Sequence, residues 1–160
     1  ASICPFLSEN GCSFVLNDFY YAVSKYVAKN SMMVINTKDF SITTCPVILE
    51  GFGTVFFLDS EAIVHQNIVY AYACDGRHGV SGILAGTRES DGFHWRIVET
   101  SGPAPPKSCD DPTAGFSDGI DGRYFIIPQC PNEYYDEDTP YFYELNLNNM
   151  EWSRHQLNEV

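Results

Sequence analysis

Short runs in which apolar and polar residues alternate recur along most of this chain. The clearest covers residues 93–100, FHWRIVET, which opens with an apolar side chain at every second position. Successive side chains of a strand point to opposite faces, so this period predicts strands rather than helices. Further short β-rich runs cover residues 32–36, 40–48, 54–58, 63–64, 68–74, 123–127, 141–147 and 151–157. The pattern predicts an all-β protein with antiparallel sheets.

Two segments are ambiguous in this pattern. Residues 17–29 fit a helix capped by Asn17 or Asp18, but they also fit a strand around residues 19–23, which we favour. Residues 79–86 are small and glycine-rich, typical of a loop or a thinly packed strand. Turns are expected at the polar or glycine-containing pairs Lys38-Asp39, Gln66-Asn67, Asp91-Gly92, Asp118-Gly119, Asp121-Gly122 and Asn148-Asn149.

The length and composition indicate one domain over residues 1–160. Apolar residues make up 44% of the chain, which is enough for a packed core. The sequence is rich in Tyr and Phe, with ten and eleven of them, and these residues favour the half-buried surface of a strand. The only linker-like stretch is GPAPP, residues 102–106, which has too many prolines for a central strand.

A loose repeat is visible around the two tryptophans. Residues 91–106 and 141–157 each place a Trp early in a strand, just after a turn, and Phe40 takes the Trp position in a degenerate first copy. A period near 50 residues with several strands per unit is typical of propeller blades. In detail, YFYELNLNNMEW resembles the third strand, turn and Trp-bearing fourth strand of the kelch-repeat family. HWRIVETSGPAPP resembles its fourth strand and proline-rich connector.

The kelch resemblance implies a propeller segment, because closed propellers take four or more blades and this chain would supply three. The alternative is a disulfide-bonded β-sandwich that closes on itself at this length. Six cysteines favour disulfides, with buried free thiols as the other interpretation, and six allow fifteen pairings. They are Cys4, Cys12, Cys45, Cys74, Cys109 and Cys130.

Charge narrows the range of partners. The formal net charge is −12, from 21 acidic and nine basic side chains, so nucleic acid and anionic membranes would be repelled. The chain contains no run of eighteen apolar residues, so no membrane span is predicted. A protein partner, particularly a basic one, suits this field. The cysteines and the absence of an initiator Met favour a secreted, extracellular chain, with a cytoplasmic one as the alternative.

Candidate catalytic and metal-binding groups do not form a recognisable motif. Cys74 and His78 are four residues apart but lack two further ligands for zinc, and Asp110, Asp111, Asp118 and Asp121 lack the spacing of a calcium loop. No metal or cofactor is therefore expected. A ribonuclease-like hydrolase remains an alternative, with a site assembled from His94, Glu99, Arg123 and His155.

Two segments have the composition of a binding surface. One combines acids with adjacent tyrosines, which offer a large contact area at low entropic cost: Glu133, Tyr134, Tyr135, Asp136, Glu137 and Asp138. The other is a predicted hairpin tip that carries Arg77 and His78. The sequence thus predicts a non-enzymatic, secreted protein-binding domain, with an intracellular kelch-like scaffold and a small secreted hydrolase as alternatives.

Overall fold

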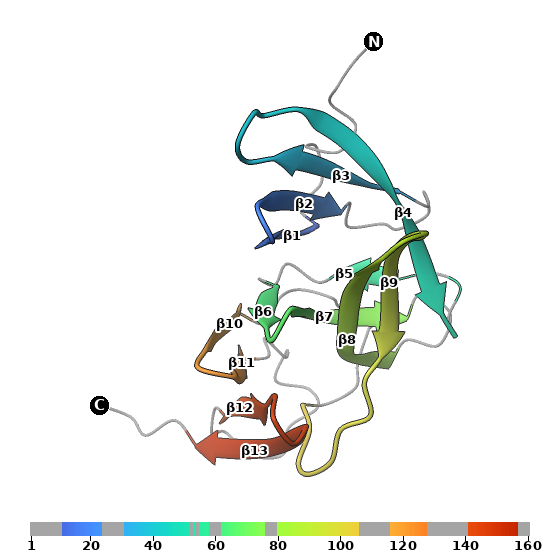
Figure 1. Ribbon diagram of the computed structural model, residues 1–160. Coiled ribbons are helices and arrows are strands. Elements are labelled where there is room, and N and C mark those ends of the chain that lie inside the picture. Colours follow the sequence, from blue (N-terminus) through green and yellow to red (C-terminus); the bar gives the residue numbers. More distant parts are fainter. Residues whose placement is uncertain are drawn as a thin grey trace.

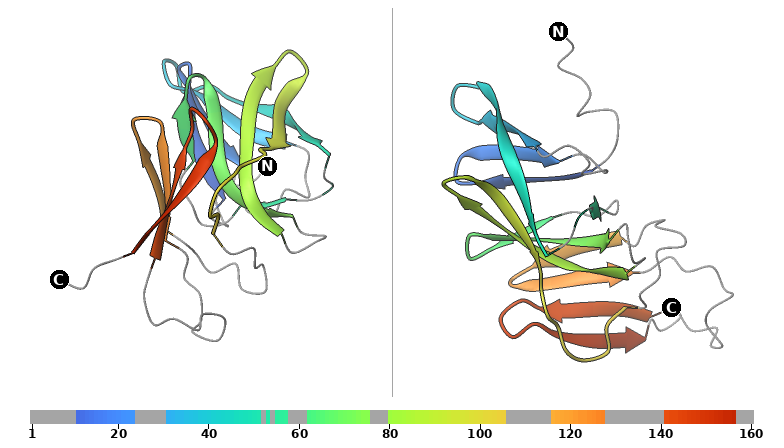
Figure 2. Two further views of the ribbon diagram at one scale, coloured as in Figure 1. Left: turned by 90° about the horizontal axis from the view of Figure 1, so that it is seen from below. Right: turned by 90° about the vertical axis from the view of Figure 1, so that its right-hand side faces the viewer.

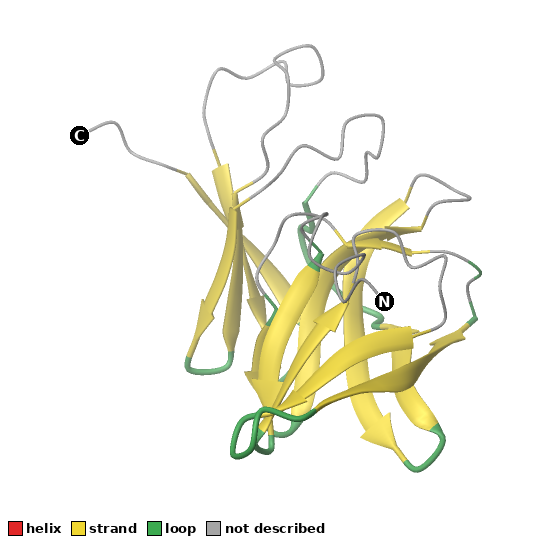
Figure 3. Cartoon of the chain, turned by 90° about the horizontal axis from the view of Figure 1, so that it is seen from above, coloured by secondary structure: helices red, strands yellow, loops and turns green. Residues whose placement is uncertain are grey.

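The protein is all-β in every segment that the structure describes. The computed structural model describes residues 11–23, 31–51, 53, 55–57, 62–75, 80–105, 116–127 and 141–156. Within these ranges the regular structure consists of strands, as Figure 3 shows, and the predicted fold class is confirmed. Since the described residues form no helix, none of them belongs to a helix long and apolar enough to cross a membrane.

The strands form two sheets (Figure 1). The larger has the order β1-β2-β3-β4-β9-β8-β7-β5, with β6 also paired to β7, and it curls into a nearly closed barrel because β1 contacts β6. Its strands are β1 (Cys12–Leu16), β2 (Phe19–Val23), β3 (Ser31–Asn36), β4 (Ile42–Glu50), β5 (Val55–Phe57), β6 (Ile63–His65), β7 (Ile68–Asp75), β8 (Val80–Glu89) and β9 (Gly92–Ile97). The smaller sheet has the order β10-β11-β12-β13. Its strands are β10 (Phe116–Ile120), β11 (Arg123–Ile127), β12 (Tyr141–Asn146) and β13 (Glu151–Gln156).

In chain order, the strands make three consecutive antiparallel meanders. The first meander is β1–β4, the second is β6–β9, with β5 added beside β7, and the third is β10–β13. The first and second meanders join through β4 and β9, the parallel pair in the larger sheet. The third meander stacks on the second as a separate layer (Figure 2).

Each meander begins with the same kind of hairpin. The two turn residues of each have positive φ: Asn17 and Asp18, Gln66 and Asn67, and Asp121 and Gly122. Positive φ at both central residues is the geometry of a type I′ turn, whose twist matches that of the flanking strands. Asn, Asp and Gly tolerate this conformation best, which explains most of these six positions.

The first and third meanders also share their second turn. Asn36 and Asn146 each begin it, and their carbonyl oxygens accept hydrogen bonds from the backbone N–H four residues later, in Phe40 at 2.8 Å and Met150 at 2.7 Å. Both Asn side chains also accept a hydrogen bond from the N–H two residues later, at 2.9 Å in each case. In both meanders the residue after the Asn donates its N–H to the last residue of the type I′ turn, at 2.9 and 2.8 Å.

The meanders pack on one another through two hydrophobic cores. The first core lies between the first and second meanders and includes a cluster of aromatic rings: Phe14, Tyr21, Phe93 and Trp95. The second core lies between the second and third meanders and includes Tyr70, Ile83, Tyr124, Ile126, Leu145 and Trp152. The second meander supplies both cores because alternate residues of its strands face opposite sides: Val69 lies in the first core and Tyr70 in the second.

The same contact between meanders therefore occurs twice. The second residue after the type I′ turn faces the preceding meander, as Val69 and Tyr124 show, and the third faces the following meander, as Tyr21 and Tyr70 show. By this register Tyr20 lies on the outer face of the first meander and Phe125 on that of the third. The outer face of the first meander is therefore equivalent to the faces through which the second and third meanders contact the meander before them. The outer face of the third is equivalent to the faces through which the first and second contact the meander after them.

Most predicted strands are present, and the errors lie at hairpins. The segment around residues 19–23 is strand β2, as favoured. Strands β1 and β10 were not predicted, and the expected turn at Asp118-Gly119 lies inside β10, since the chain reverses at Asp121-Gly122 instead. Residues 80–89 form strand β8 rather than a loop.

The expectation of disulfides is wrong for two of the six candidate cysteines. Cys12 and Cys45 are free thiols in the first core, each 2% exposed, so at most four cysteines remain to pair. Burial raises the pKa of both thiols above the ordinary cysteine value, so they remain protonated, small apolar side chains. Cys74 lies in β7 without a described side chain, and the other predicted disulfide residues, Cys4, Cys109 and Cys130, lie outside the described residues.

Candidate functional site

The two ends of the meanders differ in the length of their connections. At one end, here called the turn end, the described short turns join β1 to β2, β3 to β4, β6 to β7, β8 to β9, β10 to β11 and β12 to β13 (Figures 2 and 3). The turn ends of both sheets lie together, because His65 Nε2 is 3.1 Å from Asn148 Oδ1 and its ring also lies beside Gly122. The β2–β3, β7–β8 and β11–β12 connections start from the opposite end, here called the loop end.

Both predicted binding segments are attached at the loop end. Arg77 and His78 lie between β7 and β8, and the Tyr-acid segment, Glu133, Tyr134, Tyr135, Asp136, Glu137 and Asp138, lies between β11 and β12. These residues lie outside the described residues, so their contacts stay a prediction. Strands β7 and β11 are neighbours across the second core, where the Tyr72 N–H donates to the Tyr124 hydroxyl at 3.1 Å. Because both strands run toward the loop end, the connections that contain the two segments start from neighbouring strands at that end.

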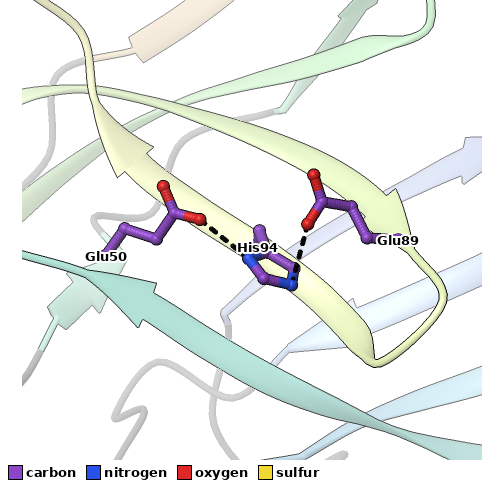
Figure 4. A group of neighbouring side chains, drawn as sticks. All are labelled: Glu50, Glu89 and His94. Carbon is purple, nitrogen blue, oxygen red and sulfur yellow. Dashed lines mark hydrogen bonds and ion pairs between the residues drawn. The ribbon is translucent and has the colours of Figure 1, made fainter.

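A second candidate is a charged cluster around His94 (Figure 4). The Nδ1 atom lies 2.8 Å from a Glu50 carboxylate oxygen, and Nε2 lies 2.9 Å from Glu89 Oε2, as Figure 4 shows. Nε2 also lies 2.6 Å from Asp91 Oδ1. The imidazole is 14% exposed, whereas the three carboxylates are at least half exposed. Both ring nitrogens therefore face carboxylates in a position where the ring itself has limited access to water.

Three local features assemble the His94 cluster. The two-residue turn between Glu89 and Gly92 brings Asp91 and Glu89 to the side of the β9 strand that carries His94. The parallel pairing of β4 with β9 places Glu50 beside it. Gly92 permits this close approach, because a Cβ there would lie 2.6 Å from the Pro46 carbonyl oxygen of β4.

Electrostatics in the cluster favour a charged imidazole. Hydrogen bonds to Asp91 first, and then to Glu50, raise the pKa of His94 above its ordinary value, and the nearby carboxylate charges add to this. In the reverse direction, the hydrogen bond from His94 lowers the pKa of Asp91. The carboxylates at both ring nitrogens thus stabilise the protonated form of the imidazole relative to the neutral one. Imidazoles and carboxylates are also common metal-binding groups, and ligand atoms of Glu50, Glu89 and His94 all lie within 4.8 Å of one another.

The structure does not bring the four hydrolase candidates together. Arg123 and His155 meet at Glu144 in the third meander, at 3.7 and 2.9 Å. The hydrogen bonds of His94 go to the carboxylates of its own cluster in the larger sheet, and Glu99 is an exposed residue after β9. The arrangement that would have favoured a hydrolase, with all four groups in reach of one another, is not observed among these described residues.

Half of the residues of the two metal motifs that the sequence disfavoured lie outside the described residues. Asp118 lies in β10 and Asp121 in the following turn, while Asp110, Asp111 and His78 lie outside the described residues. The His94 cluster was missed by the sequence analysis. Its local half, E-x-D-x-x-H across a hairpin turn, is visible in residues 89–94 and could have been found. Glu50 could not, because it comes from a strand 44 positions away.

Comparisons with known proteins assign no family. No protein-family model matches the chain, and no curated protein matches its sequence. The functional argument therefore depends on the geometry of the meanders and on the residues they present.

Proposed function

We propose that this chain is a non-enzymatic protein-recognition scaffold that binds a basic protein through its loop end. The observation that supports the proposal is that the connections containing the two predicted binding segments follow β7 and β11, which are neighbours across the second core. Binding residues are commonly found on connections that a rigid scaffold positions. The short turns at the other end leave little chain there for recognition.

Charge supports a basic partner. The net charge of −12 raises the local concentration of Lys- and Arg-rich proteins and speeds their encounter. The Tyr-acid segment adds aromatic side chains, which are enriched at the centres of protein interfaces. Its four carboxylates lie beside the two tyrosines in the sequence, so one segment combines electrostatic attraction with apolar contact area.

The repeated contact supports the propeller-type interpretation of this scaffold. The outer face of the first meander carries Val15, which is 57% exposed, and Ile42, which is 51% exposed. The outer face of the third meander carries Phe125 and Phe142, whose ring centroids are 6.3 Å apart. It also carries Ile127, which is 41% exposed. Within the part of the chain that the structure describes, these faces are the two unmatched halves of a contact that occurs twice. We propose that each packs on another four-stranded sheet of the same pattern.

The core thiols favour the scaffold without disulfides. Cys12 and Cys45 are buried as thiols, which weakens the argument for an oxidising compartment from the cysteine count. Of the two protein-binding alternatives, the intracellular kelch-like adaptor segment is therefore better supported than the disulfide-bonded secreted domain.

Two measurements test the proposal. In NMR titrations, a short Lys/Arg-rich peptide should shift amide signals at the loop end, such as those of Asp75 and Tyr141, and the effect should weaken with added salt. Signals at the turn end should stay in place, and an acidic peptide of the same length should cause no change. Shifts at the turn end, or none with the basic peptide, would contradict recognition at the loop end.

The second measurement addresses the outer faces. Analytical ultracentrifugation of the chain alone should detect concentration-dependent self-association, because the first face of one copy can cover the last face of another. Ile42→Ser should weaken this association and leave the fold intact, since the side chain is half exposed. A strictly monomeric chain at high concentration would contradict the pairing of these faces.

A further inference from the structure

We propose that His94 Nε2, Glu89 and Asp91 form a binding site for a divalent transition-metal ion, with Glu50 as the residue that positions the imidazole. The site lies where the end of β4 meets the β8–β9 turn, in the larger sheet. It is separate from the loop end and does not depend on the proposed recognition function.

The distances around Nε2 fit a coordinated ion. Neighbouring ligands of a metal at about 2.1 Å lie about 3.0 Å apart in an octahedral site and about 3.4 Å apart in a tetrahedral one. The two carboxylate oxygens lie 2.6 and 2.9 Å from Nε2, so each needs to move outward by less than about 1 Å to share an ion with it. Both side chains are at least half exposed and can make this adjustment, while the imidazole is held in place. Water would complete the coordination from the open side.

Glu50 supplies the partner that a metal-binding histidine ordinarily requires. Its carboxylate accepts the Nδ1–H hydrogen bond at 2.8 Å. In a neutral ring this hydrogen bond favours the tautomer whose lone pair is on Nε2, the atom that faces Glu89 and Asp91, so an ion that binds there takes the place of the Nε2 proton. This is the arrangement in which a carboxylate, here Glu50, hydrogen-bonds one ring nitrogen of a histidine and orients the other, here Nε2, toward a metal.

The ligand set selects the class of ion. One imidazole with two carboxylates suits Mn²⁺ or Zn²⁺, whereas Mg²⁺ and Ca²⁺ prefer oxygen ligands alone. A bound ion would connect the β8–β9 turn through His94 and Glu50 to the end of β4. Since the unfolded chain does not hold these groups together, binding should stabilise the parallel β4–β9 contact.

Mn²⁺ provides the most direct test, because its paramagnetism broadens NMR signals only near the site. Titration of the full chain should broaden the backbone signals of Glu50 and residues 89–94 and saturate at one equivalent. Zn²⁺ should displace Mn²⁺ and restore those signals, as the order of metal affinities requires, while the same concentration of Mg²⁺ should not. Broadening spread over acidic residues generally, without a maximum at His94, would overturn the proposal.

Variants test the roles of the ligands. Glu89→Gln and Asp91→Asn should each weaken Mn²⁺ binding by about tenfold or more, and Glu50→Gln should weaken it by about ten- to a hundredfold while shifting the ¹⁵N signals of the His94 ring toward the other tautomer. The matched control is Glu144→Gln, which removes the carboxylate from the 2.9 Å pair with His155 in the other sheet. Equal affinity in Glu89→Gln and in the control would mean that His94 and its carboxylates form an ion-pair cluster only.

Discussion

The two cores make the same contact between meanders but hold it in different ways. In the first core, aromatic rings stack and tilt on one another, and the β4–β9 backbone ladder joins the two meanders. In the second core, polar atoms of the large side chains bridge the layers: the Tyr124 hydroxyl accepts from the Tyr72 N–H, and Trp152 Nε1 donates to Thr100 Oγ1 at 3.0 Å. Among the described residues, the backbone hydrogen bonds that join the second and third meanders come from the segment around Ser101, which runs beside β13.

This difference indicates that one pattern of faces can be stabilised by apolar packing or by a few directional hydrogen bonds. The first core should be sensitive to volume and the second to the loss of single polar atoms. The third meander, which lacks a continuous ladder to the second, should also open before the barrel does.

The largest effect is expected from Trp95→Ala in the first core. The side chain is fully buried, with its ring centroid 5.1 Å from that of Phe93 and 6.1 Å from that of Phe14. Its removal leaves a cavity and should lower the free energy of unfolding by about 3–5 kcal/mol. Urea unfolding followed by circular dichroism measures this, and a loss below about 1 kcal/mol would refute the dependence on volume.

The next largest effect is expected when a methyl group is added to the first core. A Cβ at position 86 would overlap the Phe93 ring and lie 2.8 Å from the Trp95 ring, so Gly86→Ala should destabilise by about 1–3 kcal/mol. Gly82→Ala is the matched control in the same strand, since a Cβ there would meet nothing within 4 Å. If thermal unfolding places both variants at the same midpoint, the first core is more deformable than the account requires.

Tyr124→Phe tests the polar side of the comparison. It removes the acceptor of the Tyr72 N–H without changing the ring, and we expect a loss of about 1 kcal/mol. Tyr143→Phe is the control, because this buried tyrosine of the same core makes no hydroxyl hydrogen bond with described residues. Hydrogen exchange should detect faster opening of the third meander in Tyr124→Phe. Equal exchange in both variants would argue against the hydrogen bond as a link between layers.

The smallest expected effect is a pH dependence of stability, which the β3–β4 turn should contribute and the equivalent β12–β13 turn should not. Asp39 accepts hydrogen bonds from the Ser41 hydroxyl at 2.7 Å and from its N–H at 2.9 Å, which lower the pKa of Asp39. Its contribution is therefore present above the pKa of the unfolded chain and is lost as pH falls through the lower, folded value. Asn149, in the third meander, accepts the equivalent N–H bond from Glu151 and does not titrate.

Unfolding of wild type and Asp39→Asn at several pH values measures this contribution. The wild type should be slightly more stable at neutral pH, and the two should converge in acid. A difference that persists unchanged at low pH would show that the carboxylate charge is not its source.

Sequence periodicity predicted the strands whose side chains alternate, but it failed where tertiary pairing decides. Strand β10, with the sequence FSDGI, has little intrinsic β propensity and is ordered by its pairing with β11. Strand β1 does alternate, with Cys12, Phe14 and Leu16 buried, but it was not predicted, and Asn17 and Asp18 were considered only as possible helix caps and not as a type I′ turn. The cysteine count could not distinguish core thiols from disulfides.

The central claim is recognition at the loop end, and the most direct test compares two aromatic replacements. The affinity of the Lys/Arg-rich peptide should fall by more than about 1 kcal/mol in the double variant Tyr134→Ala/Tyr135→Ala. It should stay the same in Phe40→Ala, which removes a 75% exposed ring at the turn end. Unchanged affinity in the folded double variant, or an equal loss in Phe40→Ala, would contradict the assignment of recognition to the Tyr-acid segment.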